Sequence, residues 1–374
     1  MGNEMRLDMR ESVAGADLRA ALDQGYTLPA SWYTAPAWFA REQERIFRRC
    51  WQYVGLTAQV ARPGDFFTCR VGEAPLIVTR DEAGALRAFV NVCRHRASLL
   101  VAQECGHGKL FQCPYHAWTY GLDGALRAAP GMRDEPGFDQ DRFPLFAARV
   151  DTWGPFIFAN LDPEARPLAE TLGELPGLVE ATRAPLGAIK RRVRSVYDIA
   201  ANWKAVVDNY LECYHCPVAH PGFSRLIDTQ NYRVTEYEYF STQGGPLKAA
   251  QGADEASLYD TSGAVRDGFY AFLWPNFTLN IYPGRGNTSL NLFLPLAPDR
   301  TRAIFDYCFV DEVGGEEERD FVRFIEQVQG EDIALCESVQ QGLRAGFYQQ
   351  GQLMLKQEQA LRHFQRLVHR FVTD

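Results

Sequence analysis

The spacing of the hydrophobic positions changes twice along the chain. In residues 1–46 one helix is predicted around 17–23, and a second, which runs just past this part, over 37–47, where apolar residues recur at helical spacing. From Trp51 to about Asp162 the apolar runs are short and end at Gly or Pro turns, which is typical of strands; examples are the segments 66–71, 76–79 and 156–161. This middle part is predicted to be a small β domain.

A connecting stretch rich in Pro, Gly and Leu follows at 163–188, and from Val193 strand-like runs and helical segments occur together. Helices are predicted from Asn202 and, toward the end of the chain, over 316–342 and 350–371. Strands are predicted at 193–199, 232–240, 268–274, 277–282, 289–295 and 302–310. The pattern therefore predicts an α+β protein in three parts: N-terminal helices that pack on the last part (1–46), a β domain (47–163) and an α+β domain (164–374).

The composition is that of an ordinary globular protein. Hydrophobic residues make up 46% of the 374 residues and charged residues 23%, which is enough apolar material for more than one core. The formal net charge of -8 argues against nucleic acid as the main partner, because binding to phosphates needs a basic surface. The nine cysteines are scattered, and no signal peptide or long apolar run is visible. We therefore expect a cytoplasmic protein without a membrane segment.

Two short segments combine a cysteine with a histidine. Cys93-Arg-His95 is separated by seventeen residues from Cys113-Pro-Tyr-His116. Two thiolates and two imidazoles can bind one tetrahedral zinc ion, or a [2Fe-2S] cluster with the cysteines on one iron and the histidines on the other. Zinc sites usually group like ligands, as Cys-x2-Cys followed by His-x3-5-His. Because each segment here supplies one ligand of each kind, the spacing favours the cluster.

This pattern resembles that of the Rieske proteins, and the sequence Cys-Pro-Tyr-His-Ala-Trp resembles their oxygenase branch. Respiratory Rieske proteins carry a second cysteine in each ligand loop, and these two cysteines form a disulfide. The matching positions here hold Ser98 and Tyr115. The resemblance thus implies a low-potential [2Fe-2S] cluster without a disulfide, bound by Cys93, His95, Cys113 and His116.

The helix predicted at the start of the third part carries a second polar group. Asp208, Glu212 and His215 are spaced i, i+4 and i+7, so they are predicted to lie along one side. The opposite, apolar side is formed by Trp203, Val206, Val207, Tyr210, Leu211 and Tyr214. Pro217 ends the helix, which lets His220 fold back toward His215. A polar row of this kind is usually a solvent-exposed face. Beside a Rieske motif, however, it suits a non-haem Fe(II) site, which needs two neutral imidazoles and one carboxylate.

The carboxylate of such a site is predicted to come from the long helix near the C-terminus. Asp332 lies within an apolar stripe of that helix, formed by Ile325, Val328, Leu335, Cys336 and Val339. A carboxylate on an apolar face is costly to bury unless it is paired or bound to a metal. Glu331 is the alternative ligand, but the geometry of the stripe favours Asp332.

The segment Asn202-Trp-Lys-x4-Asn-Tyr-x-Glu-Cys-Tyr-His-Cys-Pro-x2-His220 resembles the iron motif of the α subunits of Rieske non-haem iron oxygenases. Together with the cluster motif and the Asp332-x4-Glu337 helix, the resemblance covers nearly the whole chain. It implies an all-β Rieske domain followed by an α+β catalytic domain with an antiparallel sheet and flanking helices. It also implies a mononuclear Fe(II) bound by His215, His220 and Asp332.

The resemblance further implies a homotrimer in which electrons pass between subunits. In the family an acidic residue three positions before the first iron histidine connects it to a cluster histidine of the neighbouring subunit; here that residue is Glu212. Asp208 is a second candidate catalytic residue whose role is open. The chain has no GxGxxG fingerprint. A separate flavin- or ferredoxin-type reductase, reduced by NAD(P)H, is therefore expected to supply the electrons for the reaction with O₂.

A glutamate at position 212 resembles the group of the family that oxidises quaternary ammonium compounds such as carnitine, glycine betaine, choline and proline betaine. Most ring-hydroxylating dioxygenases have Asp there. We therefore expect hydroxylation of an N-methyl compound with loss of formaldehyde. Phe272, Trp274, Phe277 and Tyr282 could line a pocket for the cation, or pack in the core. An aromatic pocket would equally suit an arene, so a ring-hydroxylating dioxygenase is one alternative. An electron-carrier or zinc protein without a second iron site is the other.

Overall fold

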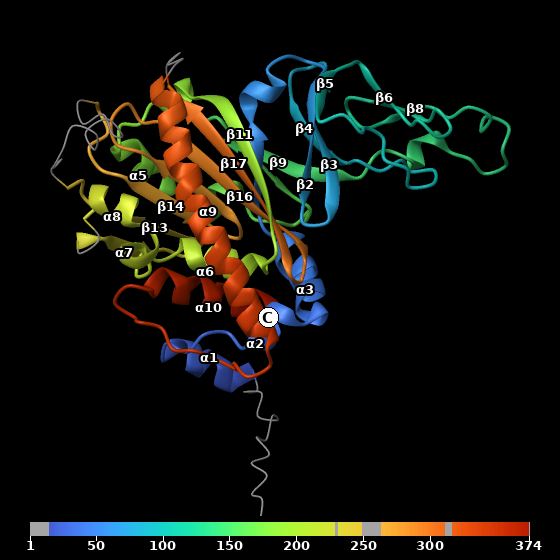
Figure 1. Cartoon of the computed structure of the whole chain (residues 1–374). Helices are drawn as coiled ribbons and strands as arrows, with labels where there is room; N and C mark the ends of the chain where they lie inside the picture. The colour runs from blue at the N-terminus through green and yellow to red at the C-terminus, as the bar shows by residue number, and fades with distance from the viewer. Residues whose placement is uncertain (1–14, 229–230, 249–262, 311–315, 374) are drawn as a thin grey trace, which may run out of the picture.

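The computed structural model describes residues 15–228, 231–248, 263–310 and 316–373. Two β-rich units lie side by side, as Figure 1 shows. The smaller unit contains both cysteine–histidine segments, and the larger unit contains the predicted iron site. Within the described ranges, no helix is long and apolar enough to cross a membrane.

The smaller unit consists of an antiparallel seven-stranded sheet and a three-stranded sheet. The large sheet has the order β1-β10-β9-β4-β3-β2-β5, with strands β1 (Gln52–Leu56), β2 (Asp65–Val71), β3 (Ala74–Arg80), β4 (Leu86–Val90), β5 (Cys105–His107), β9 (Ala147–Trp153) and β10 (Phe156–Asn160). The small sheet contains β6 (Leu110–Gln112), β7 (Thr119–Gly121) and β8 (Leu126–Ala128). The cysteine–histidine segments are the loops after β4 and β6, and they meet in the core that joins the two sheets.

The larger unit is built on a second antiparallel sheet of seven strands. Its order is β11-β17-β16-β15-β14-β13-β12, with strands β11 (Lys190–Ile199), β12 (Arg233–Glu236), β13 (Phe240–Gly244), β14 (Phe269–Leu273), β15 (Phe277–Ile281), β16 (Thr288–Ala297) and β17 (Arg300–Phe309). The fold class predicted from the sequence, an all-β domain followed by an α+β domain with an antiparallel sheet and flanking helices, is confirmed.

Both faces of this second sheet are covered. One face packs on α6 (Trp203–Tyr210), α9 (Glu316–Arg344) and α10 (Gln359–Thr373). The other face packs on α4 (Leu168–Leu172), α5 (Leu175–Ala181) and strands β1 and β10 of the smaller unit. Because a covered sheet excludes water from both sides, β15 is buried along its whole length. The second of these contacts joins the two units through one apolar core.

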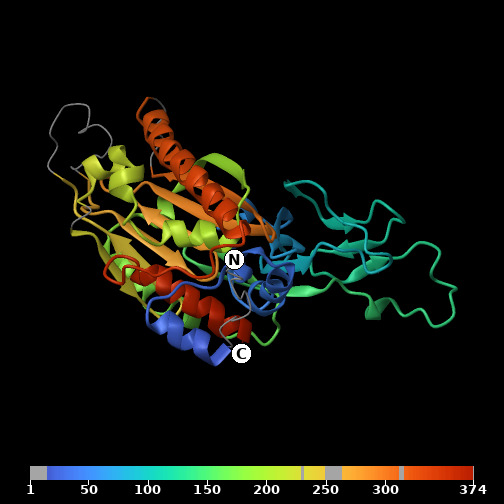
Figure 2. The ribbon, with the colours of Figure 1, turned by 60° about the horizontal axis from the view of Figure 1, so that its bottom comes forward.

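The two ends of the described chain pack on each other. The helices α1 (Gly15–Asp23), α2 (Ala30–Thr34) and α3 (Pro36–Glu42) lie against α10 and α9, and Figure 2 shows α1 in blue beside α10 in red. The sequence predicted that the last helix begins near residue 350, which is wrong, because α10 begins at Gln359. The backbone before it is bonded to the N-terminal segment instead: Thr27 N donates to the oxygen of Gly351 (3.0 Å).

Candidate metal centres

The two cysteine–histidine loops fold into the same turn. Cys93 N donates to the carbonyl oxygen of Ser98 (2.8 Å), and the carbonyl oxygen of Cys93 accepts from Ala97 N (3.0 Å). The second loop repeats both bonds at 2.8 and 3.1 Å, with Cys113, Trp118 and Ala117. Both alanines have a positive φ, 58° and 56°, which a small side chain tolerates in a tight turn. The repeated turn puts like ligands next to each other.

The sulfur and nitrogen ligands differ in exposure. Cys93 and Cys113 are only 2% and 3% exposed, whereas His95 and His116 are exposed, with ring centroids 4.7 Å apart. Burial raises the pKa of Cys113, but hydrogen bonds from backbone N–H groups of its turn outweigh this and lower it overall. Two buried thiols, of which Cys113 has a lowered pKa, and two surface imidazoles fit a [2Fe-2S] cluster with one inner and one outer iron.

The helix α6 positions the second site, but it is shorter than predicted. It begins after Asn202, whose side-chain oxygen accepts from Lys204 N (3.0 Å), and it ends at Tyr210. The sequence predicted a helix that continues to Pro217 with Tyr214 on its apolar side. The first prediction is wrong because α6 ends at Tyr210. The second is wrong because the side chain of Tyr214 is 49% exposed.

The carboxylate of Glu212 explains why the helix stops. Its Oε2 accepts hydrogen bonds from the backbone N–H groups of Tyr214 and His215, which a continuing helix would have used. A disulfide between Cys213 and Cys216 closes the same turn. The number and spacing of the cysteines did not predict this pairing. The short helix α7 (Cys216–Ala219) then leads to His220.

Three bonds hold α9 against the start of α6. Glu337 Oε1 accepts from Ala200 N (3.0 Å), and Gln340 Oε1 accepts from Asn202 N (2.8 Å). Cys336 donates to the carbonyl oxygen of Ala205 (3.8 Å). One turn before Cys336 on the same helix, Asp332 is thereby brought to the histidines.

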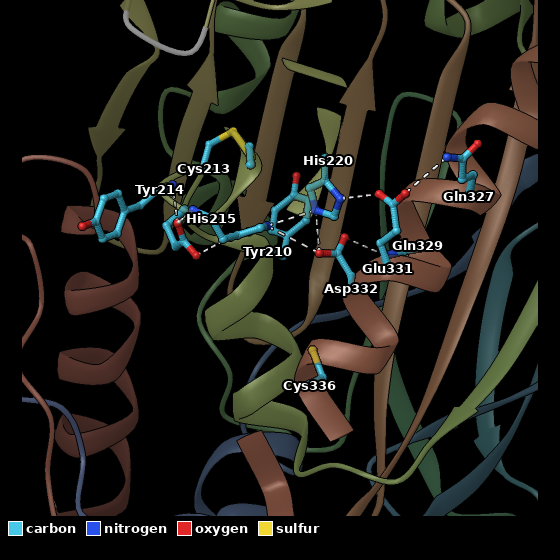
Figure 3. A network of polar contacts seen from close by, with 12 residues as sticks. Tyr210, Cys213, Tyr214, His215, His220, Gln327, Gln329, Glu331, Asp332 and Cys336 are labelled. Carbon is cyan, nitrogen blue, oxygen red and sulfur yellow. Dashed lines mark hydrogen bonds and ion pairs between the residues drawn. A yellow bond between two sulfur atoms is a disulfide. The ribbon is translucent and has the colours of Figure 1, made fainter. Parts of the chain in front are cut away.

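His215, His220 and Asp332 converge, as Figure 3 shows. Their facing atoms are two Nε2 atoms 3.1 Å apart and Asp332 Oδ1, which lies 2.9 Å from His220 Nε2 and 3.5 Å from His215 Nε2. Glu331 lies on the far side of His220, where its Oε2 is 2.7 Å from Nδ1. Of the two carboxylates weighed from the sequence, Asp332 faces both histidines, and Glu331 holds the outer nitrogen of one.

The outer nitrogen of each imidazole contacts a carboxylate, Glu212 for His215 and Glu331 for His220. Such contacts fix the rings so that both Nε2 atoms point to the same place. Burial lowers the pKa of His215, but Asp332 and Glu212 raise it to about 9. The negative potential that raises this pKa also attracts a divalent cation, so two histidines and one carboxylate fit a non-haem Fe(II).

A cavity of about 130 Å³ adjoins the three converging side chains. Aromatic and amide side chains line it, from α6, the sheet and α9, and they include Tyr210, Phe223, Tyr232, Gln243, Tyr270, Asn280, Tyr282 and Asn291. Among the described residues, no lysine or arginine lines this cavity. The sequence missed most of these residues. The detectable signal was amides within strands that are otherwise apolar.

Of the four predicted pocket residues, only Tyr282 lines this cavity. Trp274 and Phe272 pack on Phe364 of α10, with ring centroids 5.8 and 5.6 Å apart. Phe277 points to the opposite face of the sheet and stacks on Tyr53 at 4.4 Å. The prediction for these three residues is wrong, because the helices and the smaller unit cover those parts of the sheet. They pack in the core, the alternative that the sequence left open.

Asp208 lies away from the converging ligands. Its Oδ2 accepts from Tyr33 O–H (2.6 Å) and from Gln365 Nε2 (3.1 Å). Burial raises the pKa of Asp208 to about 7, and these hydrogen bonds reduce the effect. The predicted row of Asp208, Glu212 and His215 on one helix is therefore wrong. The three residues do line a second cavity of about 520 Å³.

The sequence models of two protein families match the chain. The family "Rieske [2Fe-2S] domain" matches residues 50–146, and the family "Ring hydroxylating alpha subunit (catalytic domain)" matches residues 186–374. The chain therefore belongs to the Rieske non-haem iron oxygenases. Its cofactors are a [2Fe-2S] cluster and a mononuclear iron. The family expected from the motifs is thereby confirmed, and the electron-carrier and zinc alternatives are not favoured.

Within that family the similar proteins include several monooxygenases. The chloroplastic choline monooxygenase of Arabidopsis thaliana is 36% identical, with 97% of this chain and 86% of that protein covered. The carnitine monooxygenase oxygenase subunit of Escherichia coli K12 is 32% identical, with 94% and 95% covered. The quaternary ammonium Rieske monooxygenase CntA with L-carnitine has a TM-score of 0.83 at 29% identity, with 94% and 97% covered. Naphthalene 1,2-dioxygenase from a Rhodococcus species, 21% identical with a TM-score of 0.76 and 95% and 98% covered, shares the fold.

Proposed function

We propose that this oxygenase hydroxylates a C–H bond of a small quaternary ammonium compound. The observation that carries the proposal is the aromatic cavity beside His215, His220 and Asp332. Four tyrosines line it together with neutral amides; they are Tyr210, Tyr232, Tyr270 and Tyr282. The faces of aromatic rings attract a desolvated cation. A lysine or arginine in the lining would repel that cation, and none of the described residues that line the cavity is a lysine or an arginine.

In this proposal Cys93, His95, Cys113 and His116 bind the cluster, and His215, His220 and Asp332 bind the iron. The bound cluster supplies electrons, and the bound iron supplies the activation of O₂. Inserting one oxygen atom into C–H and reducing the other to water consumes two electrons and two protons. A separate NAD(P)H-dependent flavin reductase provides the electrons.

We further propose that electrons pass between the subunits of a homotrimer. Within one chain the cluster loops and the iron site lie in different units and far apart in both views (Figures 1 and 2). The cavity next to Glu212 and His215 has an apolar rim that includes Leu335, Val339 and Tyr348. Val339 is 52% exposed, which suits a surface covered by a neighbouring subunit. Glu212, which contacts the outer nitrogen of His215, is the connecting residue in this proposal.

A substrate panel tests the proposed reaction. The iron-loaded protein is combined with NADH and a generic reductase, and is supplied with N-methyl cations or arenes. We expect aldehyde or formaldehyde release from the cations and no diol from the arenes. Diol formation without turnover of any cation would overturn the proposal. His215→Ala should keep the absorption of the cluster and lose product formation.

Glu212→Gln tests the electron path. The amide keeps the size of the side chain but removes the charge that faces His215, so we expect both metals to remain bound while the cluster is oxidised more slowly. Single-turnover absorption spectroscopy measures that rate. An unchanged rate of cluster oxidation at full iron content would exclude the role proposed for Glu212.

A further inference from the structure

A cysteine pair lies in the turn that carries the iron ligands. Cys213 and Cys216 form the disulfide, and the other seven of the nine cysteines, all among the described residues, are free. Cys213 directly follows Glu212. Cys216 directly follows His215 and begins α7, whose end leads to His220. The disulfide, drawn in Figure 3, therefore joins the turn of the first iron histidine to the helix that places the second.

Backbone hydrogen bonds hold this turn independently of the sulfur atoms. The N–H of Cys216 donates to the carbonyl oxygen of Cys213 (3.3 Å), and the carbonyl oxygen of Cys216 accepts from His220 N (2.9 Å). The carbonyl oxygen of His215 accepts from Val218 N (2.9 Å). Because none of these bonds involves a sulfur atom, breaking the sulfur–sulfur bond removes none of them. The folded turn is therefore compatible with either a disulfide or two thiols.

Both cysteines lie beside the cavity of the iron site. They line the cavity of about 130 Å³ that adjoins the iron ligands, and they keep small exposed fractions of 8% and 5%. A small neutral molecule formed at the iron therefore reaches the pair before it reaches the solvent. On the outer side, Val218 of the four-residue helix α7 is 88% exposed, so local opening of this helix exposes the pair to a dithiol in solution.

Uncoupled turnover supplies a small oxidant at this place. When O₂ takes up two electrons and two protons without oxidising a C–H bond, it leaves as hydrogen peroxide. Two thiols and one molecule of hydrogen peroxide give one disulfide and two molecules of water, so each sulfur loses one electron and each oxygen gains one. An external dithiol reverses the change by exchange, in which its own two thiols become a disulfide.

We propose that Cys213 and Cys216 are a peroxide-reactive pair, which captures hydrogen peroxide formed by uncoupled turnover at the neighbouring iron and thereby becomes the disulfide. This inference rests on the proposed function, because the oxidant comes from the reduction of O₂. The disulfide limits how far the turn of His215 can move from α7, so the oxidised protein holds its iron more tightly than the dithiol form does. The pair removes peroxide and stabilises the metal site in the same step.

Alkylation followed by mass spectrometry measures the state of each cysteine. The iron-loaded protein is reduced with dithiothreitol, freed of it under argon, and turned over with reductase, NADH and O₂ without substrate. Catalase is present and removes the peroxide that escapes. We expect Cys213 and Cys216 to become protected from alkylation, while the exposed thiol of Cys105 stays reactive. Equal alkylation of all three would overturn the proposal, and so would a pair that dithiothreitol does not reduce in the folded protein.

Direct addition of peroxide separates this inference from the proposed function. One equivalent of hydrogen peroxide, added under argon to the dithiol form without reductase, should also produce the disulfide. If it does, but turnover without substrate and with substrate consumes no O₂, the proposed function fails and the reactivity of the pair is confirmed. If the added peroxide leaves both thiols open to alkylation, the pair is not peroxide-reactive, whatever the oxygenase does.

The rate of iron loss to a chelator tests the effect on the metal site. We expect the disulfide form to lose iron at least about threefold more slowly than the dithiol form. The double variant Cys213→Ser with Cys216→Ser should behave like the dithiol form in every buffer, whereas Cys105→Ser, the matched control, should follow the unmodified protein. Equal rates for the two oxidation states would exclude the effect on iron binding. That comparison uses one protein, so it is decisive even if the double variant does not fold.

Discussion

The carboxyl group of Asp208 should make the stability of the catalytic unit depend on pH. Its pKa is raised from 3.8 to about 7, first by burial, and its Oδ1 is buried without a donor among the described residues. Between these two pKa values the folded protein binds a proton that the unfolded chain has released. The free energy of unfolding therefore falls as pH rises from about 4 to about 7.

The magnitude follows from the shift. One pKa unit corresponds to about 1.4 kcal/mol, so ionising this buried group removes up to about 4 kcal/mol of stability by pH 8. Asp208→Asn keeps an oxygen for Tyr33 and Gln365 and never ionises. We expect the variant and the unmodified protein to be nearly equal in stability at pH 4.5, with the variant more stable by several kcal/mol at pH 8.

Urea denaturation followed by tryptophan fluorescence measures this difference, with both proteins at the same iron content. Asp198→Asn is a matched control, since its hydrogen bond to Arg302 lowers the pKa of Asp198. That control should show the same difference at pH 4.5 and pH 8, because a carboxyl with a lowered pKa is ionised in both the folded and the unfolded protein throughout this range. A difference for Asp208→Asn that is the same at pH 4.5 and pH 8 would refute the reasoning.

Two further substitutions test how the site is held. Glu331→Ala removes the carboxylate at 2.7 Å from His220 Nδ1, and we expect the affinity for iron to fall by about 10- to 100-fold in a chelator titration, whereas exposed Asp320→Ala leaves it unchanged. Lys204→Met leaves buried Glu42, whose Oε1 lies 2.5 Å from Lys204 Nζ, without an opposite charge, and should lower the free energy of unfolding in urea by about 3–5 kcal/mol. Adding Glu42→Gln should restore much of that loss; no recovery would show that the ion pair is not the cause.

The motifs could be found in the sequence because their chemistry is local. Each cysteine–histidine loop is a single turn, so Cys93 and His95 are placed by bonds within six residues. Most of the predicted strands also correspond to observed ones, whereas the strand predicted at 232–240 is wrong in extent, because β12 ends at Glu236 and β13 begins at Phe240. Asp332 was singled out because a carboxylate within an apolar stripe needs a partner, and it faces two histidines from more than 100 residues away in the chain.

The pocket could not be read in the same way. Tyr270, Phe272 and Trp274 are two residues apart in the sequence, so their spacing does not distinguish them. Only the helices that cover the sheet decide that Tyr270 lines the cavity while the other two pack on α10. The end of α6 is likewise set by Glu212, whose carboxylate competes for backbone donors. The helical spacing of apolar residues contains no information about this competition between a side chain and the helix for backbone N–H groups.

The sequence by itself determined the kinds of metal ligand, their local turns and the order of the two domains, because spacing and residue type fix bonds between near neighbours. The tertiary structure alone decided which strand residues face the iron, and that Asp208 is buried against Tyr33 and Gln365. These features depend on packing between segments that are distant in the chain. The sequence of each segment alone is compatible with several such packing arrangements.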